Sequence, residues 1–127
     1  MAHITIWRSC NSGIDVTAID INVPRSAWTA VLSYTVPVGQ TLKLIGWFGS
    51  TEQTSALMRL YVNGTKRDGC SITYNSGDIY RPLWLSAPID VPAGQIVEVH
   101  GYHAQGGGLG NLKPNALFNA GLIGYLV

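Results

Sequence analysis

The chain has 127 residues, of which 12% are charged and 46% are hydrophobic, and its net charge is +1. This length suits one domain with a core that needs no metal or disulfide. Its longest basic run, Lys66-Arg67, argues against a nucleic-acid-binding surface. No apolar run approaches the roughly 18 residues of a membrane span. The N-terminus lacks the pattern of a signal peptide, which predicts synthesis and retention in a cytoplasm until something else moves the product.

The charged share is about half that of an ordinary soluble domain. Gly, Ser, Thr, Asn and Gln replace the missing charges and leave a polar, weakly charged surface. Two interpretations stay open. The chain is either an ordinary β domain of the secreted type or a subunit whose surface is largely covered by partner subunits.

Residues 1–26 differ from the rest of the chain. An alternating stretch at residues 3–8 is broken at Cys10-Asn11-Ser12-Gly13, and a second extended pattern then runs to Pro24. This segment is either a first strand pair or an extended arm, which is stable only when it pairs with a sheet edge or another subunit.

A phrase is written twice in the remaining chain. Residues 36–47 read V-P-V-G-Q-T-L-K-L-I-G-W, and residues 91–102 read V-P-A-G-Q-I-V-E-V-H-G-Y. Proline presets φ at the second position of a type I turn, and glycine is favoured at the fourth. Each copy therefore predicts a turn that leads into a strand.

Further strands are predicted at residues 28–36, 40–48, 56–62, 70–74 and 116–127, and Asn63-Gly64 is the strongest hairpin signal. Asp68-Gly69 offers a second turn. Residues 79–85 are extended but contain Pro82, which predicts an edge or bulged strand. About eight such strands predict an all-β fold, a single antiparallel sandwich of jelly-roll type spanning residues 27–127, with an extended N-terminal segment.

No arrangement of residues points to catalysis, a cofactor or a metal. His100 and His103 are three residues apart on a predicted strand, so they point to opposite faces and cannot share a metal. The carboxylates are scattered, and the glycine loop at residues 106–110 lacks the Lys-Ser/Thr of a phosphate-binding loop. Free thiols are favoured for Cys10 and Cys70, although a disulfide stays open. We therefore expect no enzyme.

The aromatic residues are the remaining candidates for a function. Trp47 is expected in the core, and Trp7 is expected in an intersubunit contact. Tyr80 and Trp84, which flank Arg81-Pro82, are expected to form a second surface. The candidate interface residues are Ile4, Ile6, Trp7, Arg8, Tyr80, Arg81 and Trp84. Aromatics on a polar β scaffold also stack on sugar rings, which keeps a carbohydrate-binding module open.

Three segments share a characteristic pattern: Y-T-V-P-V-G-Q-T-L at residues 34–42, R-L-Y-V-N-G at 59–64 and I-D-V-P-A-G-Q at 89–95. They resemble small virion proteins of tailed bacteriophages, including capsid decoration (cement) proteins and modules of tail and baseplate proteins. The similarity covers residues 27–102 and extends to the closing strand. It implies a dimeric or trimeric β-sandwich bound outside a shell, in which residues 1–26 could form an arm that bridges neighbouring capsomers.

The expected function is that of a non-enzymatic structural protein of the virion, a decoration protein that binds and stabilises the assembled phage head. Its expected partners are the major capsid protein or other virion subunits, and copies of itself. The alternative is a carbohydrate- or receptor-binding module of a phage tail or baseplate, with a glycan as partner. The sequence leaves head and tail undecided.

Overall fold

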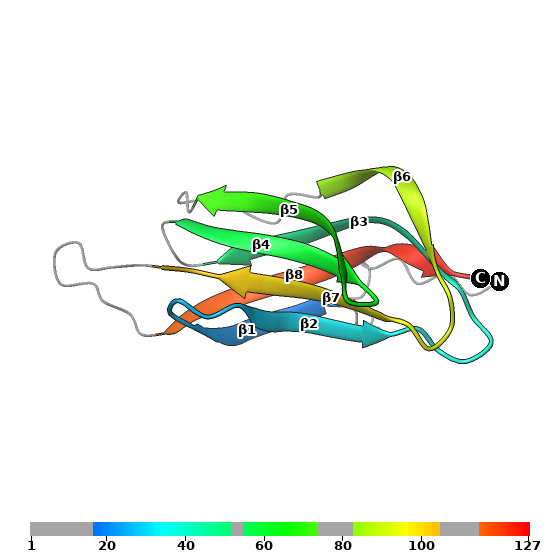
Figure 1. The fold of residues 1–127 in the computed structure, drawn as a ribbon, viewed down its shortest axis with the longest axis horizontal. Helices are drawn as coiled ribbons and strands as arrows, with labels where there is room; N and C mark the ends of the chain where they lie inside the picture. Colours follow the sequence, from blue (N-terminus) through cyan, green and yellow to red (C-terminus); the bar gives the residue numbers. More distant parts are fainter. Residues whose placement is uncertain (1–16, 52–54, 74–82, 105–114) are drawn as a thin grey trace, which may run out of the picture.

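The computed structural model describes residues 17–51, 55–73, 83–104 and 115–127. They form eight strands: β1 (Thr17–Pro24), β2 (Thr29–Thr35), β3 (Leu42–Thr51), β4 (Ser55–Val62), β5 (Thr65–Thr73), β6 (Leu83–Val91), β7 (Ile96–Tyr102) and β8 (Asn115–Leu126). The strands lie in two antiparallel sheets (Figure 1). The first sheet has the order β1-β8-β3-β6 and the second sheet β2-β7-β4-β5. The predicted all-β sandwich is confirmed.

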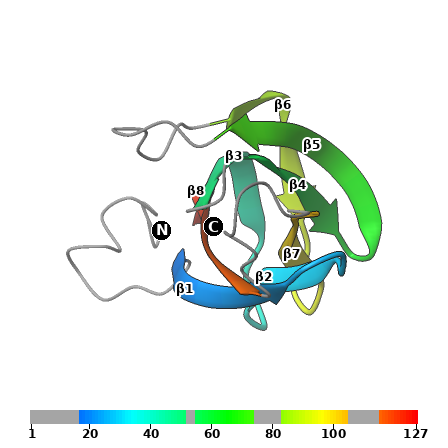
Figure 2. The same ribbon diagram turned by 90° about the vertical axis from the view of Figure 1, so that its left-hand side faces the viewer.

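The connectivity is that of a jelly roll. The β4–β5 hairpin is enclosed in sequence by the pairs β3–β6, β2–β7 and β1–β8, in that order. Successive pairs lie alternately in the second and the first sheet. Figure 2 looks along the strands and shows the two sheets facing each other. The core therefore lies between two layers that share no strand.

The central hairpin forms where the sequence predicts it. Asn63 and Gly64 have φ of 49° and 81°, as a type I′ turn requires at its two central residues. The second turn option, Asp68-Gly69, is not used, because both residues lie inside β5. The pairing of β4 with β5 shifts there by one residue, and the resulting bulge bends the strand without ending it.

The repeated turns differ from the expected type I geometry. The N–H of Gln40 donates to the carbonyl of Pro37, and that of Gln95 to the carbonyl of Pro92, both at 3.2 Å. Proline is thus the first residue of each turn and glycine the third, with φ of 79° and 84° in the two copies. This is a type II turn, in which the left-handed third position favours glycine.

The sandwich begins before residue 27. Strand β1 pairs with β8 along its length and forms one edge of the first sheet, so residues 17–24 belong to the sandwich. Residues 1–16, which include most of the expected arm, lie outside the described residues. Strand β6 forms the other edge of the first sheet. The edge strand predicted at residues 79–85 overlaps it only at residues 83–85, because residues 79–82, with Pro82, lie outside the described residues.

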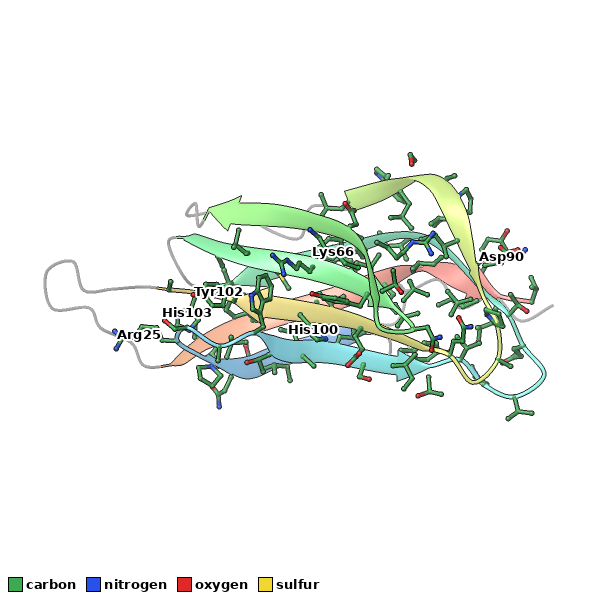
Figure 3. The ribbon with its side chains drawn as sticks, viewed as in Figure 1. Arg25, Lys66, Asp90, His100, Tyr102 and His103 are labelled. Carbon is green, nitrogen blue, oxygen red and sulfur yellow. The ribbon has the colours of Figure 1, made fainter. Side chains whose placement is uncertain are left out.

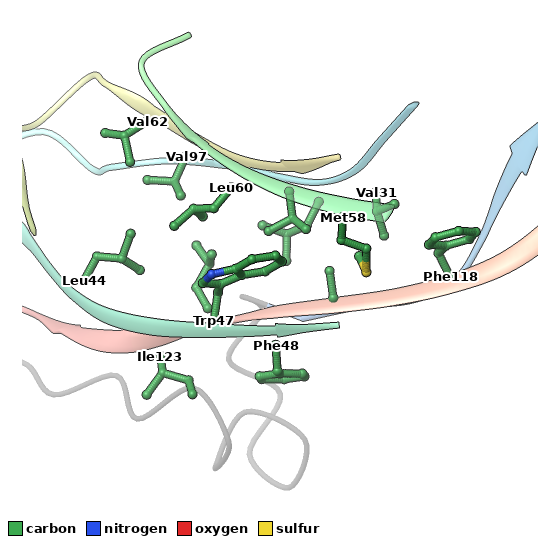
Figure 4. Close-up of a cluster of buried hydrophobic side chains, with 14 of the residues drawn as sticks. Val31, Leu44, Trp47, Phe48, Met58, Leu60, Val62, Val97, Phe118 and Ile123 are labelled. Carbon is green, nitrogen blue, oxygen red and sulfur yellow. The ribbon is translucent and has the colours of Figure 1, made fainter. Parts of the chain in front are cut away.

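The core contains side chains from both sheets (Figure 4). Trp47 is fully buried, as expected, and its indole N–H donates to Asp68 Oδ2 at 2.8 Å. Asp68 Oδ1 accepts a second hydrogen bond from the N–H of Gly69 at 2.9 Å. The β5 bulge therefore places a carboxylate where the largest core side chain needs an acceptor.

Candidate binding surface

The structure describes one of the seven candidate interface residues. Trp84 lies in β6 opposite Gly46 of β3, and it is 57% exposed on the outer face of the first sheet. The other six, Ile4, Ile6, Trp7, Arg8, Tyr80 and Arg81, lie outside the described residues. The structure therefore does not test whether the seven form one surface.

A different set of aromatic and charged residues meets on the outer face of the second sheet. The pairing of β4 with β7 sets Leu57 opposite Tyr102, Arg59 opposite His100 and Tyr61 opposite Glu98. Their neighbours Met58 and Leu60 are fully buried in the core. Because side chains alternate along a strand, residues 57, 59 and 61 point away from the core.

Two of these side chains, Arg59 and Tyr102, contact Trp28, which directly precedes β2, and we call these three residues the Trp28 cluster. The rings of Trp28 and Tyr102 stack with their centroids 5.1 Å apart. The guanidinium of Arg59 lies over the Trp28 ring, 4.1 Å from its centroid. Trp28 is still 37% exposed. The cluster is thus a preformed surface of aromatic rings and one cation.

His100 continues this surface toward Glu98. Its ring lies 4.5 Å from that of Tyr61, and its Nε2 is 3.6 Å from Glu98 Oε2, too far for a hydrogen bond. Within the described chain this Nε2 has no hydrogen-bond partner. Figure 3 shows His100 and Tyr102 along β7, and Lys66 on β5, two strands away in the same sheet.

His103 has a structural role. It is 1% exposed, and its Nε2 lies 2.7 Å from the carbonyl oxygen of Val23. Because a carbonyl only accepts, Nε2 carries the proton. The residue ties the end of β7 to β1 and points inward, whereas His100 points outward. The two histidine side chains thus lie on opposite faces of the sheet, as the alternation predicts.

A hollow of about 340 Å³ opens between β4 and β5, next to the Trp28 cluster. It is lined by Leu57, Met58, Arg59, Lys66, Gly69 and Cys70. A Cβ at Gly69 would stand 3.4 Å from Lys66 Cε and 3.6 Å from Arg59 Cγ, so both cationic side chains pass close to this glycine.

The described side chains show no arrangement suited to metal chemistry. No group of three His, Cys, Asp or Glu residues in this part of the chain could hold a metal ion. Cys70 is a free thiol, and Cys10 lies outside the described residues. Burial, together with the nearby Asp68 carboxylate, raises the pKa of the Cys70 thiol to about 11. The thiol is therefore protonated at neutral pH and a poor nucleophile.

Comparisons with known proteins add no assignment. No model of a known protein family matches the chain, and neither does any curated protein. The described residues contain no helix that could cross a membrane. The resemblance to virion proteins stays a prediction from the sequence.

Sequence reasoning missed the Trp28 cluster. Nothing along the chain says that Trp28, Arg59 and Tyr102 meet. One signal was present: in residues 56–62 and 96–102 the outward positions of the alternation carry Arg, His and Tyr.

Proposed function

We propose that this protein is a non-enzymatic structural protein of a tailed-phage particle, a decoration protein that binds the outside of the assembled head and stabilises it. The Trp28 cluster is the observation that carries this proposal: it lies outside a sandwich whose core is already filled. The phage-like turn phrases and the low charge agree with it. The protein would act as a dimer or trimer, with the major capsid protein as its main partner.

The composition of the cluster suits a protein interface. Trp, Tyr and Arg are the residues that most often dominate the binding energy of such interfaces. Because the three side chains are already stacked, binding orders them little further and costs less conformational entropy. A protein that binds the assembled shell and not its separated subunits stabilises the shell by mass action.

Co-sedimentation with shells that lack the protein tests this proposal. We expect Trp28→Ala with Tyr102→Ala to abolish binding, because the double variant removes both stacked rings. Trp84→Ala tests the other sheet, since it removes the exposed tryptophan that the sequence analysis places in a candidate interface. If Trp84→Ala loses binding and the double variant does not, the interface lies on the first sheet instead. If the wild-type protein does not co-sediment with shells, the decoration role is wrong.

The arm is a separate part of the proposal. Deletion of residues 1–12 should abolish shell binding and leave the sandwich folded, because the deletion ends before β1. Circular dichroism checks the fold and co-sedimentation the binding. Full binding by the truncated protein would remove the arm from the mechanism and leave the second sheet as the docking face.

A second candidate is a carbohydrate- or receptor-binding module of a phage tail or baseplate. The exposed part of Trp28 beside an open hollow favours it, because sugar rings stack on such aromatic faces. A glycan array identifies ligands, and titration with a hit should change the tryptophan fluorescence of the wild type but not of Trp28→Ala. An array without hits and an unchanged spectrum would exclude this candidate.

A further inference from the structure

The hollow above Gly69 has a chemistry that the aromatic surface alone does not explain. Two cationic side chains, Arg59 and Lys66, border it, and Leu57, 40% exposed, supplies an apolar wall. Within the described chain neither cation is paired with a carboxylate. The hollow therefore combines two cations that have no carboxylate partner in the described chain with one lining residue, Gly69, that has no side chain.

Two carboxylates of the described chain lie on the strands around the hollow, Asp68 in β5 and Glu98 in β7. Asp68 is adjacent to Gly69 in the chain, but its two oxygens accept hydrogen bonds from the Trp47 indole and from the Gly69 N–H. Glu98 is 3.6 Å from His100 on β7. Neither carboxylate forms an ion pair with Arg59, whose N–H groups are left with no acceptor in the described chain.

Arg59 makes a cation–π contact, because its Cζ lies over the Trp28 ring, 4.1 Å from the ring centroid. Its N–H groups, which lie along the edge of the planar guanidinium, have no acceptor in the described chain. A planar carboxylate can accept two parallel hydrogen bonds from such an edge. Lys66, which also passes close to Gly69, adds a second positive charge as a flexible point charge.

We propose that the hollow between β4 and β5 binds the carboxylate of a Glu or Asp side chain from a protein partner, held by Arg59 and Lys66. This inference rests on the proposed function, for which it names the contact at the centre of the docking face. The hollow is open to solvent, so it suits a side chain that projects from a larger surface. Leu57 packs against the methylenes of that side chain.

The test is an NMR titration of the labelled protein with a capped oligoglutamate peptide. A capped oligoglutamine peptide of equal length is the control for the backbone and the methylenes. We expect oligoglutamate to shift the signals of the Gly69 amide and the Trp28 indole, and oligoglutamine to leave both unchanged. Equal shifts with the two peptides, or shifts only at remote residues, would overturn the proposal.

Three variants locate the contact. Arg59→Gln should weaken oligoglutamate binding by about 10- to 100-fold, because a charge-assisted bond is lost. Lys66→Gln should weaken it by about two- to fivefold, as expected for an exposed charge. Lys43→Gln changes the net charge equally but lies on the first sheet, paired with Asp90, and should have no effect. Equal weakening by all three variants would mean that only the overall charge matters.

Two further arms separate the possible failures. Glucuronate presents the same carboxylate on a sugar, and if it shifts Gly69 while oligoglutamate does not, the protein partner is wrong. The titration needs no phage particle. A positive titration with no shell binding contradicts the decoration role alone, whereas shell binding that survives Arg59→Gln, with a negative titration, contradicts the carboxylate site alone.

Discussion

The carbonyl of Val36 accepts a hydrogen bond from the N–H of Gly94 at 2.9 Å, so the two copies of the repeated turn phrase bind each other. The N–H of Val36 also donates to the carbonyl of Gln95 at 3.0 Å. The repeat joins the end of β2 to the start of β7, next to the ladder that these strands form. The two type II turns thus act as one clamp at that end of the sandwich.

The clamp depends on glycine at its left-handed positions. Gly39→Ala and Gly94→Ala should each lower the free energy of unfolding by about 1 kcal/mol, because an L side chain is strained at positive φ. No atom stands within 4 Å of a Cβ at either position, so the cost is backbone strain alone. Urea denaturation measures it. Asparagine, which tolerates this conformation better, should cost less than alanine at both sites; equal costs would contradict the account.

Because Asp68 accepts the hydrogen bond of the Trp47 indole, its substitution should lower stability much more than substitution of a surface aspartate. Asp68→Ala should destabilise the protein by about 1–3 kcal/mol, because it leaves the buried indole N–H without an acceptor. Asp90 is the control. It pairs with Lys43 on the surface, so Asp90→Ala should cost less than about 1 kcal/mol. Thermal unfolding compares the two variants, and a similar loss in both would contradict the role of Asp68.

The Cys70 thiol predicts a loss of stability in alkali. Its pKa is raised from 9.0 to about 11 in the folded protein, by burial first and by Asp68 second. Below pH 9 the thiol is protonated in the folded and the unfolded chain, and its contribution is fully present. As the pH rises from 9 to 11, the unfolded chain ionises first, and this contribution is lost.

Denaturation at a series of pH values, in a Cys10→Ser background, measures the effect. Cys70→Ala should flatten the decline between pH 9 and 11. Burial also raises the pKa of Tyr34, so a decline at higher pH should remain in both proteins. Parallel pH profiles with and without Cys70 would show that the thiol is not responsible.

The hydrogen bond between His103 and the Val23 carbonyl connects the end of β7 to β1, and its loss should destabilise the fold. His103→Leu introduces an apolar side chain of similar size without a donor, and should lower the free energy of unfolding by about 1–3 kcal/mol. His103→Gln, which can still donate, should cost less. Hydrogen exchange should show faster opening of β1 in the leucine variant. Equal stability of the two variants would contradict a role for the hydrogen bond.

Local signals predicted much of the fold. Asn63-Gly64, Pro82 and the repeated phrase each marked a turn or an edge from a few neighbouring residues, and alternation then supplied the strands. The predicted type of the repeated turns was wrong, because proline and glycine each lie one position earlier in the turn than predicted. Pro-x-Gly fits both a type I and a type II turn until φ of the glycine is known.

The site was harder to predict because its residues meet only through pairing in the sheet. Arg59, Trp28 and Tyr102 come from three separate segments, and their contact depends on the β4–β7 register. Asp68 looked like a turn residue, and only the bulge in β5 turns its carboxylate toward Trp47. Interactions between distant parts of the chain leave little trace in the local pattern.

The nested strand order also favours one order in which the strand pairs form during folding. The β4–β5 hairpin closes the shortest loop, and each further pair, out to β1–β8, must close a longer one at a higher entropic cost. During synthesis β1 leaves the ribosome well before its partner β8 is made. Until then β1 is an unpaired edge that another chain could bind, so slow translation between the two strands would favour aggregation over folding.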